Sequence, residues 1–342
     1  MIFSFILLAL LLVSLLFQAA HMVDRFTNLN LTHQRMAGPR MDEVVLEDNG
    51  SRNKVAVVRV EGIISSQFDD AGYDMVDLIK EQLMRADEDK YVKAVVLRVD
   101  SPGGEVLAAD DIARAVENFQ KDTGKPVVCS MGSLAASGGY YVAATCRWIT
   151  ASELTITGSI GVIMHGWNYR GLMDKLGLRP DVYKSGKYKD MLSGERSESE
   201  IPPEEHAMVQ ALITETFQKF KNVVAEGRTS AHKENGKEGR ALAANWSDYA
   251  DGRVLSGKQA YDLGFVDQLG DYDDAVDKAM ELAGITEAES ANVIEYQTRH
   301  ELADFLRLFG KSESRAVKVD LGVELPQVRA GYLYFLAPTY VR

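Results

Sequence analysis

Runs of β-branched residues alternate with amphipathic segments along this chain, and that alternation limits the folds it can adopt. Residues 54–60, 94–99 and 126–129 are almost continuously apolar, which is typical of strands covered on both faces. Between them, residues 75–83 carry apolar side chains four apart, the spacing of one helix face, and residues 105–120 have a helical pattern. Strands that alternate with helices in this way predict an α/β fold with a parallel sheet and right-handed crossovers.

Similar patterns continue towards the C-terminus. They predict further strands over residues 148–150, 160–164 and 181–183. They also predict a short helix over residues 169–176 and a long helix over residues 202–227, which begins at a proline suited to a first helical turn.

The first residues of the chain have a different character. Residues 2–20 contain no charged side chain, and at about 1.5 Å per helical residue they are long enough for a bilayer core of ~30 Å. We therefore expect a transmembrane anchor at residues 1–22, a polar tether at 23–53, a folded domain at 54–290 and a C-terminal tail at 291–342. A cleaved signal peptide is the alternative, but no basic residue precedes the apolar run, and Gln18 or Phe17 would occupy the −3 position of the cleavage site, where a small residue is expected.

Three arginines follow the anchor, at positions 25, 35 and 40. The positive-inside rule read literally would place them in the cytoplasm, although large domains are often translocated regardless of such charges. We expect a single-pass protein of the inner (plasma) membrane whose main domain is extracytoplasmic.

The composition excludes several functions. A net charge of −12 argues against nucleic-acid binding, which needs a clustered basic face. The two cysteines, Cys129 and Cys146, cannot form a disulfide framework, and Cys129 ends an apolar run that is typical of a buried strand. The six histidines are scattered without metal-ligand spacing, so we expect neither a metal nor another cofactor.

Ser137 is a candidate nucleophile. It follows the strand at 126–129 and opens residues 138–144, which can be helical. Backbone amides at the start of such a segment can receive an anion that forms on an attacked carbonyl, and Gly138 has no side chain to keep a substrate away. Small residues at this point are also compatible with tight packing of a helix on a sheet.

A second glycine-rich segment supports this hypothesis. Residues 100–104, Asp-Ser-Pro-Gly-Gly, follow the strand at 94–99 and are predicted to form a turn. Because the carboxyl ends of parallel strands share one edge of the sheet, Gly103 and Gly104 should face Ser137. Amides from two separate loops would form an oxyanion hole, although an ordinary Pro-Gly turn has the same sequence pattern.

Lys189 is a candidate base for that serine. A lysine amine accepts a proton at neutral pH only when burial lowers its pKa from about 10.4. Lys189 follows the predicted strand at 181–183, and the hydroxyl of Ser159 could hold its amine by a hydrogen bond. Lysines in such a segment are also compatible with solvated charges at the end of a strand.

Several short motifs, in order and with similar spacing, resemble the bacterial signal peptide peptidase A family. They are Asp100–Gly104, Met131–Tyr141, Thr157–Val162, Lys187–Asp190, Ala250–Arg253 and Ala260–Asp267. The resemblance covers about residues 54–285.

This resemblance implies a ClpP/crotonase-like fold of stacked βαβ units. It implies a serine–lysine dyad with Ser137 as nucleophile, Lys189 as general base and Ser159 supporting the lysine, and an oxyanion hole formed by the amides of Gly104 and Gly138. It also implies a membrane-anchored enzyme that degrades remnant signal peptides and other apolar, membrane-associated peptides. The short single-repeat form, which this chain matches, implies a homo-oligomeric ring, an octamer, with sites completed by neighbouring subunits.

The tail ends in an apolar, aromatic stretch at residues 331–338. Similar tails in the family reach the active site and are trimmed, but a docking element at a subunit interface would have the same composition.

Three other functions remain to be weighed. His165 could act as the base of a Ser–His–Asp triad, as in ClpP peptidases. A crotonase-type enzyme would bind an acyl-CoA thioester and would need a positioned carboxylate instead of a nucleophilic serine. A non-catalytic membrane scaffold could keep the fold without turnover.

Overall fold

The computed structural model describes residues 39–68, 73–286, 289–298 and 333–336. The described residues from Met41 onward belong to one compact unit. Its strands are β1 (Met41–Glu47), β2 (Lys54–Ile64), β3 (Val92–Glu105), β4 (Val127–Ala136), β5 (Trp148–Ala151), β6 (Ile156–Gly158), β7 (Ile163–Met164), β8 (Val254–Ser256), β9 (Gln268–Leu269), β10 (Asn292–Thr298) and β11 (Leu333–Leu336). Its helices are α2 (Met75–Glu88), α3 (Val106–Thr123), α4 (Gly138–Ala143), α5 (Arg170–Lys175), α6 (Pro203–Glu234), α7 (Gly257–Asp262) and α8 (Tyr272–Leu282).

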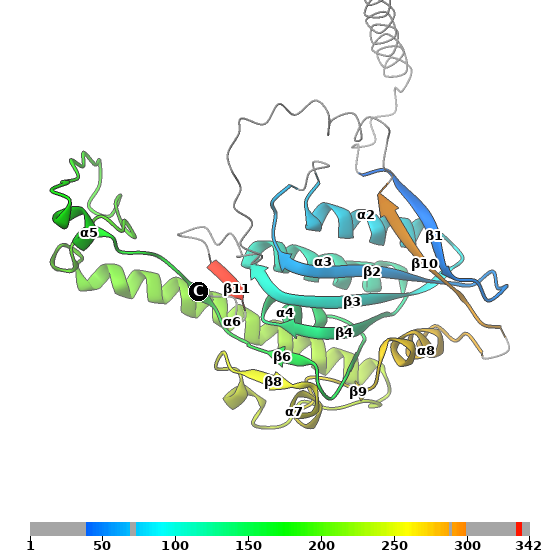
Figure 1. Cartoon of the computed structure of the whole chain (residues 1–342). Helices are drawn as coiled ribbons and strands as arrows, with labels where there is room; N and C mark the ends of the chain where they lie inside the picture. The colour runs from blue at the N-terminus through cyan, green and yellow to red at the C-terminus, as the bar shows by residue number, and fades with distance from the viewer. Residues whose placement is uncertain (1–38, 69–72, 287–288, 299–332, 337–342) are drawn as a thin grey trace, which may run out of the picture. The chain divides into compact units, whose positions relative to one another are not determined.

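A mixed sheet lies at the centre of this unit (Figure 1). The strand order is β1-β10-β2-β3-β4-β5-β9, and every neighbouring pair from β10 to β9 is parallel, whereas β1 is antiparallel to β10. Shorter strands branch from this path, since β6 pairs with β4 and β8, and β11 pairs with β3 and β7. The predicted α/β fold with a largely parallel sheet is confirmed.

Both faces of the central strands are buried, which explains their unbroken apolar runs. In β2, Val58 and Val60 pack into a cluster with side chains of α2, α3 and α4. Val55 and Val57 of the same strand point to the opposite face and pack with α8. Because successive side chains of a strand alternate between faces, a strand between two helical layers must be apolar at nearly every position.

The predicted strands at 54–60, 94–99, 126–129 and 148–150 are confirmed, and so are the predicted helices. The predicted turn at residues 100–104 is wrong. β3 continues to Glu105 through a shift in its pairing with β2, and Gly103 adopts a φ of 97° there. The backbone stays extended because β2 lies on one side of this segment and β11 on the other.

Two further predictions need correction. Within residues 160–164 only Ile163 and Met164 form a strand, β7. Residues 181–183 form no strand, and all three are exposed. β propensity mainly reflects packing against neighbouring strands, and these exposed side chains have no such packing.

The predicted domain boundaries are too narrow. Residues 41–47, assigned to the tether, form β1, and residues 292–298, assigned to the tail, form β10. β10 inserts between β1 and β2, so both segments complete the sheet.

The predicted anchor at residues 1–22 lies outside the described residues. None of the helices that are described is both long and apolar enough to span a bilayer.

A lobe formed by residues 165–201 connects β7 to α6 and contains α5. Figure 1 shows this lobe beyond the edge of the sheet, near the N-terminal end of α6. Many of its large apolar side chains are exposed, namely Trp167, Leu172, Leu176, Leu178, Val182, Tyr183 and Leu192. A hydrophobic surface of this kind is characteristic of an interaction site.

The C-terminal half of α6 is held against the sheet by a buried ion pair. Arg228 is inaccessible to solvent and binds the carboxylate of Asp267, which is equally buried. Arg228 also donates a hydrogen bond of 2.8 Å to the carbonyl of Cys146, which follows α4. The pair therefore connects α6, the end of the α4 segment and the loop before β9.

Candidate active site

Ser137 lies at the junction of β4 and α4, where the chain turns sharply. Its φ of 54° and ψ of −116° are unusual for a residue with a side chain, and such strain costs of order 1–3 kcal/mol. Its amide donates to the carbonyl of Gly158 over 2.9 Å, which fixes the turn to β6. The side chain is 1% exposed, and its Oγ has no hydrogen-bond partner among the residues that the structure describes. A strained, buried and unpartnered hydroxyl at a strand-to-helix turn is the geometry of a nucleophile.

The glycines predicted to face Ser137 do lie beside it. A side chain on Gly138 would meet the Cα of Gly103 and the amide nitrogen of Gly104, each 3.1 Å from its Cβ position. On Gly104, a Cβ atom would lie 1.8 Å from the carbonyl oxygen of Ile64. Only glycine therefore allows β2, β3 and the serine turn to approach so closely. The two residues expected to supply oxyanion donors, Gly104 and Gly138, therefore lie close together, although Gly104 lies on a strand and not on a turn.

Ser159 also lies next to the serine turn. Ala136 and Gly158 are paired across β4 and β6, so Ser159 follows directly after the residue that binds the Ser137 amide. Ser159 is 3% exposed and has a φ of 51°. Its amide donates to the carbonyl of Arg253 over 2.7 Å.

The turn at residues 251–253 forms backbone hydrogen bonds with Ser159 and with the residue after it. Asp251 accepts hydrogen bonds from the amide and the guanidinium of Arg253, which lower the pKa of its carboxyl to about 2. The amide of Gly252 donates to the carbonyl of Ile160 over 3.0 Å. A hollow of about 280 Å³ lies between this turn, Ser159, β7 and Leu336.

The structure does not bring Lys189 to Ser137. Lys189 lies in the lobe, in the turn-rich stretch 187–190, and is exposed. Its amide donates to the carbonyl of Gly186 over 3.2 Å, and the hydroxyl of Ser137 has no partner in the described part of the chain. The described part of the chain therefore does not bury Lys189, and burial is what its role as a base would require.

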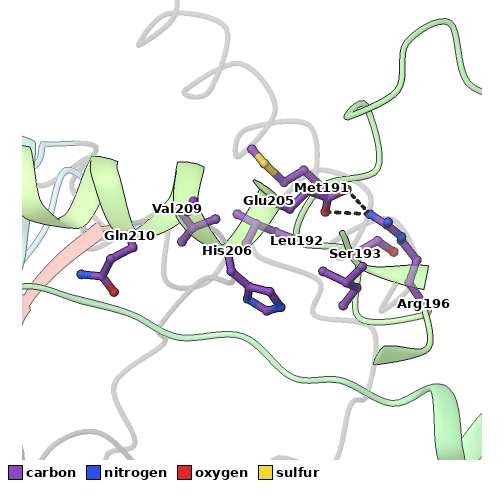
Figure 2. A pocket seen from close by; sticks show the side chains of 10 residues that line it. Met191, Leu192, Ser193, Arg196, Glu205, His206, Val209 and Gln210 are labelled. Atoms are coloured by element: carbon purple, nitrogen blue, oxygen red, sulfur yellow. Dashed lines mark hydrogen bonds and ion pairs between the residues drawn. The ribbon is translucent and has the colours of Figure 1, made fainter. Parts of the chain in front are cut away.

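The lobe contains a hollow of its own, of about 490 Å³, between residues 191–201 and the first turns of α6. Figure 2 shows Arg196 on its wall, joined to Glu205. The guanidinium donates to both carboxylate oxygens of Glu205, over 3.0 and 2.8 Å. Ser137 does not line this hollow, and we assign its shape to the packing of the lobe on α6.

His165 does not act on the serine in this structure. Its ring packs against that of Trp167, with 5.1 Å between centroids, and among the described residues none forms a hydrogen bond with the Ser137 hydroxyl. The triad expected of the ClpP alternative is thus not assembled among the described residues.

The strand β11 lies beside these glycines. This strand runs antiparallel to β3, with Phe335 opposite Gly104 and Leu336 opposite Gly103, and on its other side it pairs with β7. The carbonyl oxygen of Phe335 lies 2.0 Å from the Cβ position of Gly103 and 3.2 Å from that of Gly138. An extended peptide thus lies against the glycines, in the way that strand addition places a ligand on a sheet edge.

Sequence reasoning missed the side chains that surround this strand. Phe335 contacts the rings of Tyr141 and Phe220, which lie on α4 and α6. The position of Tyr141, four residues after Ser137, was a signal that its ring shares the serine's side of α4. Nothing in the sequence near Phe220 indicates that it reaches the same place.

The sequence of the chain is similar to those of known peptidases. Residues 119–286 match peptidase family S49. The chain is 38% identical over 263 residues to an Enterococcus faecium protein named signal peptide peptidase SppA, covering 75% of this chain and 70% of that protein. It is 40% identical to a Synechocystis protease, covering 69% of this chain and 76% of the relative. It is 36% identical to Protease 4 of Haemophilus influenzae, covering 69% of this chain and 36% of that protein.

Among solved structures, a mutant of the 1510-N membrane-bound stomatin-specific protease with a substrate peptide matches at 17% identity. The TM-score is 0.39, over 75% of this chain and 97% of that one, which is too low to support an inference.

Together, the serine turn and the relatives define a serine peptidase. The chain belongs to peptidase family S49, the family of the signal peptide peptidase A proteins, and the resemblance seen in its motifs is confirmed.

Proposed function

We propose that this chain is a membrane-anchored serine endopeptidase that cleaves remnant signal peptides and other apolar peptides through an acyl-enzyme on Ser137. The observation that carries the proposal is the hydroxyl of Ser137, which is buried, unpartnered and held in a strained turn beside Gly103 and Gly104. Buried hydroxyls normally form hydrogen bonds within the protein, and this one forms none with the described residues. A bound substrate and a base would provide the missing partners.

The reaction follows from this arrangement. The Oγ of Ser137 attacks the substrate carbonyl carbon while its proton passes to a base. The carbonyl oxygen becomes an anion, which the amides of Gly104 and Gly138 stabilise. The C–N bond then breaks, the leaving nitrogen takes the proton, and the acyl group stays on Ser137 as an ester. A water molecule attacks that ester while the base takes its proton. The bond between the acyl carbon and Oγ then breaks, the base returns the proton to Oγ of Ser137, and the shortened peptide leaves as a carboxylic acid.

Lys189 is the base in this proposal, and it acts on the serine of a second copy of the chain. Within one copy it is exposed and apart from Ser137, on a lobe with an apolar surface. Docking of that surface in a ring would bury the lysine, and a desolvated lysine amine can act as a general base. Ser159, beside the serine turn, would then hold the amine. We further propose the octameric ring and the ClpP/crotonase-like topology that the family motifs imply.

The membrane anchor at residues 1–22 and an extracytoplasmic catalytic domain belong to the same proposal. The uncharged N-terminal stretch supports them. An anchored site lies close to the bilayer, where apolar peptides concentrate.

The test is peptide hydrolysis by the full-length protein in detergent. Ser137→Ala and Lys189→Ala should each lower kcat/KM by several orders of magnitude, whereas Lys187→Ala, at an exposed lysine in the same turn, is the matched control. His165→Ala should leave activity intact. Hydrolysis by Ser137→Ala protein, or loss of activity in His165→Ala protein, would contradict the assignment.

Mixing the two inactive variants tests whether the site is shared. In a ring with head-to-tail contacts, random mixing of Ser137→Ala and Lys189→Ala subunits restores both groups at about a quarter of the sites. A site completed within one chain would stay inactive in the mixture. Fluorophosphonate labelling of Ser137 separates the peptidase from the crotonase and scaffold alternatives, which do not require a reactive serine.

A further inference from the structure

The strand that leads to Ser137 contains a bulge. Val99 of β3 pairs with Met131 of β4, and Ser101 pairs with Ala135, so β4 advances by four residues where β3 advances by two. A bulge bends its strand and redirects the side chains that follow it, and bulges are frequent beside active sites. The extra residues of β4 therefore affect where this strand places the serine.

β4 changes its neighbour at the bulge. Residues 128–130 pair with β5, whereas residues 134–136, after the bulge, pair with β6. β6 ends at Gly158, whose carbonyl binds the amide of Ser137, and Ser159 follows directly. The bulge thus brings the end of β4 to the strand that lies beside the serine turn.

Asp100 holds the bulge from the side of β3. Its Oδ1 accepts a hydrogen bond of 3.1 Å from the amide of Leu134, which lies between the two residues of β4 that stay in register with β3. Gly132 lies so close to the carboxyl group that a Cβ atom on it would be 2.7 Å from both Cγ and Oδ2 of Asp100. A glycine at this point leaves room for the carboxylate. The side chain of Asp100 therefore fills the bulge and provides an acceptor for its amide.

Two buried threonines hold the same segment from the side of β6. The hydroxyl of Thr155 donates to the carbonyl of Gly132 over 2.8 Å, and that of Thr157 donates to the carbonyl of Ala135 over 2.6 Å. Both threonines are almost inaccessible to solvent. These bonds connect the bulge to β6 and to the residue before it, just as Asp100 connects it to β3.

Asp100 also lies on the strand that carries the glycines of the expected oxyanion hole. Gly104 follows it by four residues, and the amide nitrogen of Gly104 lies 3.1 Å from the Cβ position of Gly138. We propose that Asp100 is a positioning residue for the peptidase reaction, because its bond to Leu134 fixes the strand of the nucleophile to the strand of these glycines. The proposal rests on the proposed peptidase function and adds to it a residue that acts through β4 and not on the substrate.

Loss of this bond should affect kcat more than KM. Oxyanion donors stabilise the charge that develops in the transition state, so a displaced donor lowers kcat. Since a displacement of ~1 Å costs about 100-fold in rate, Asp100→Ala should lower kcat by ~100-fold and change KM by less than ~3-fold. Asparagine keeps an oxygen that can accept from the amide, and a neutral hydrogen bond is about half as strong as a charged one, so Asp100→Asn should lower kcat by ~10-fold or less.

The first experiment measures kcat and KM of the full-length protein in detergent for a fluorogenic apolar peptide. Asp100→Ala and Asp100→Asn are compared with Asp89→Ala. Asp89 is the matched control because it is also half-buried, lies just before the opposite end of β3, and accepts a hydrogen bond of 2.8 Å from the amide of Tyr91. Asp89→Ala should lower Tm and leave kcat unchanged.

Three results of this experiment would overturn the proposal. They are an unchanged kcat in Asp100→Ala protein, an Asp100→Asn protein as slow as Asp100→Ala, and an equal loss of kcat in Asp89→Ala protein. Recovery of most of the activity by asparagine, together with the split between kcat and KM, separates positioning from a general loss of folded protein.

Hydrogen exchange distinguishes failure of this role from failure of the peptidase function. Deuterium uptake in peptides that contain Leu134, read by mass spectrometry, reports the bond to Asp100 without any turnover. Uptake there should be at least ~10-fold faster in Asp100→Ala protein, close to wild type in Asp100→Asn and unchanged in Asp89→Ala. Faster uptake supports the role of Asp100 even if wild-type protein hydrolyses nothing. Uptake equal to that of wild type in Asp100→Ala protein overturns it even if kcat falls.

Discussion

Replacing Arg228 by methionine should destabilise the protein far more than the loss of an ordinary charge. The side chain of Arg228 is 0% exposed and that of its partner Asp267 is 1% exposed. Without the guanidinium, the Asp267 carboxylate keeps a hydrogen bond of 2.9 Å from the amide of Ile149 but has lost its cation in a dry environment. Leaving one member of a buried pair uncompensated costs about 3–5 kcal/mol.

At 2–4 °C per kcal/mol for a domain of roughly this size, Arg228→Met should lower Tm by about 6–20 °C. Differential scanning calorimetry of the full-length protein in detergent measures the shift. The control is Lys258→Met, at an ion pair with Asp262 in which the two side chains are 50% and 53% exposed, which should cost about 1 kcal/mol or less. Equal shifts for Arg228→Met and Lys258→Met would refute the argument from burial.

The double variant Arg228→Met/Asp267→Asn provides a second check. Asparagine has no charge but keeps an oxygen that can accept from the amide of Ile149, so the uncompensated anion disappears. The double variant should therefore regain about 2 kcal/mol or more of the stability lost in Arg228→Met. A double variant as unstable as the single one would show that packing, and not the orphaned charge, causes the loss.

Three further outcomes are expected. Gly104→Ala should lower kcat/KM at least ~100-fold because its Cβ would lie 1.8 Å from a carbonyl oxygen of β2, whereas Gly166→Ala, with nothing within 4 Å, should have no effect on hydrolysis. Mass spectrometry should find a C-terminus trimmed at Phe335 in wild-type protein and an intact one in Ser137→Ala protein, and identical C-termini would exclude self-trimming. Asp251→Asn should lower kcat/KM by the same modest factor from pH 5 to 9, because Arg253 holds the pKa of the Asp251 carboxyl at about 2 and the carboxylate is lost only as the pH falls towards that value. A ratio of variant to wild-type activity that changes within this pH range would contradict that assignment.

The parts of the fold that sequence predicted are those specified by local patterns. β2, β3, β4 and β5 carry unbroken apolar runs because both of their faces are buried, and the helices between them show their period directly. The position of Ser137 beside Gly103 and Gly104 followed from the rule that parallel strands end at one edge.

The remaining errors arise from contacts between distant segments. β10 looks like the start of a tail until it pairs with β2, and residues 100–104 look like a turn until β2 and β11 extend them. Exposure of Lys189 depends on where the lobe lies, which no local pattern encodes. The ring contacts of Phe335 with Tyr141 and Phe220 join three separate elements, so no window of sequence contains them.

The insertion of β10 has a consequence for how the protein is made. β2 begins at Lys54, yet one of its two neighbours in the sheet begins only at Asn292. Until that residue has left the ribosome, the edge of β2 has unpaired backbone groups that another chain can bind. Pairing across such a long stretch of chain is also slow to form. A nascent chain cut short before residue 292 should therefore aggregate, even though the serine turn and all the glycines around it are already present.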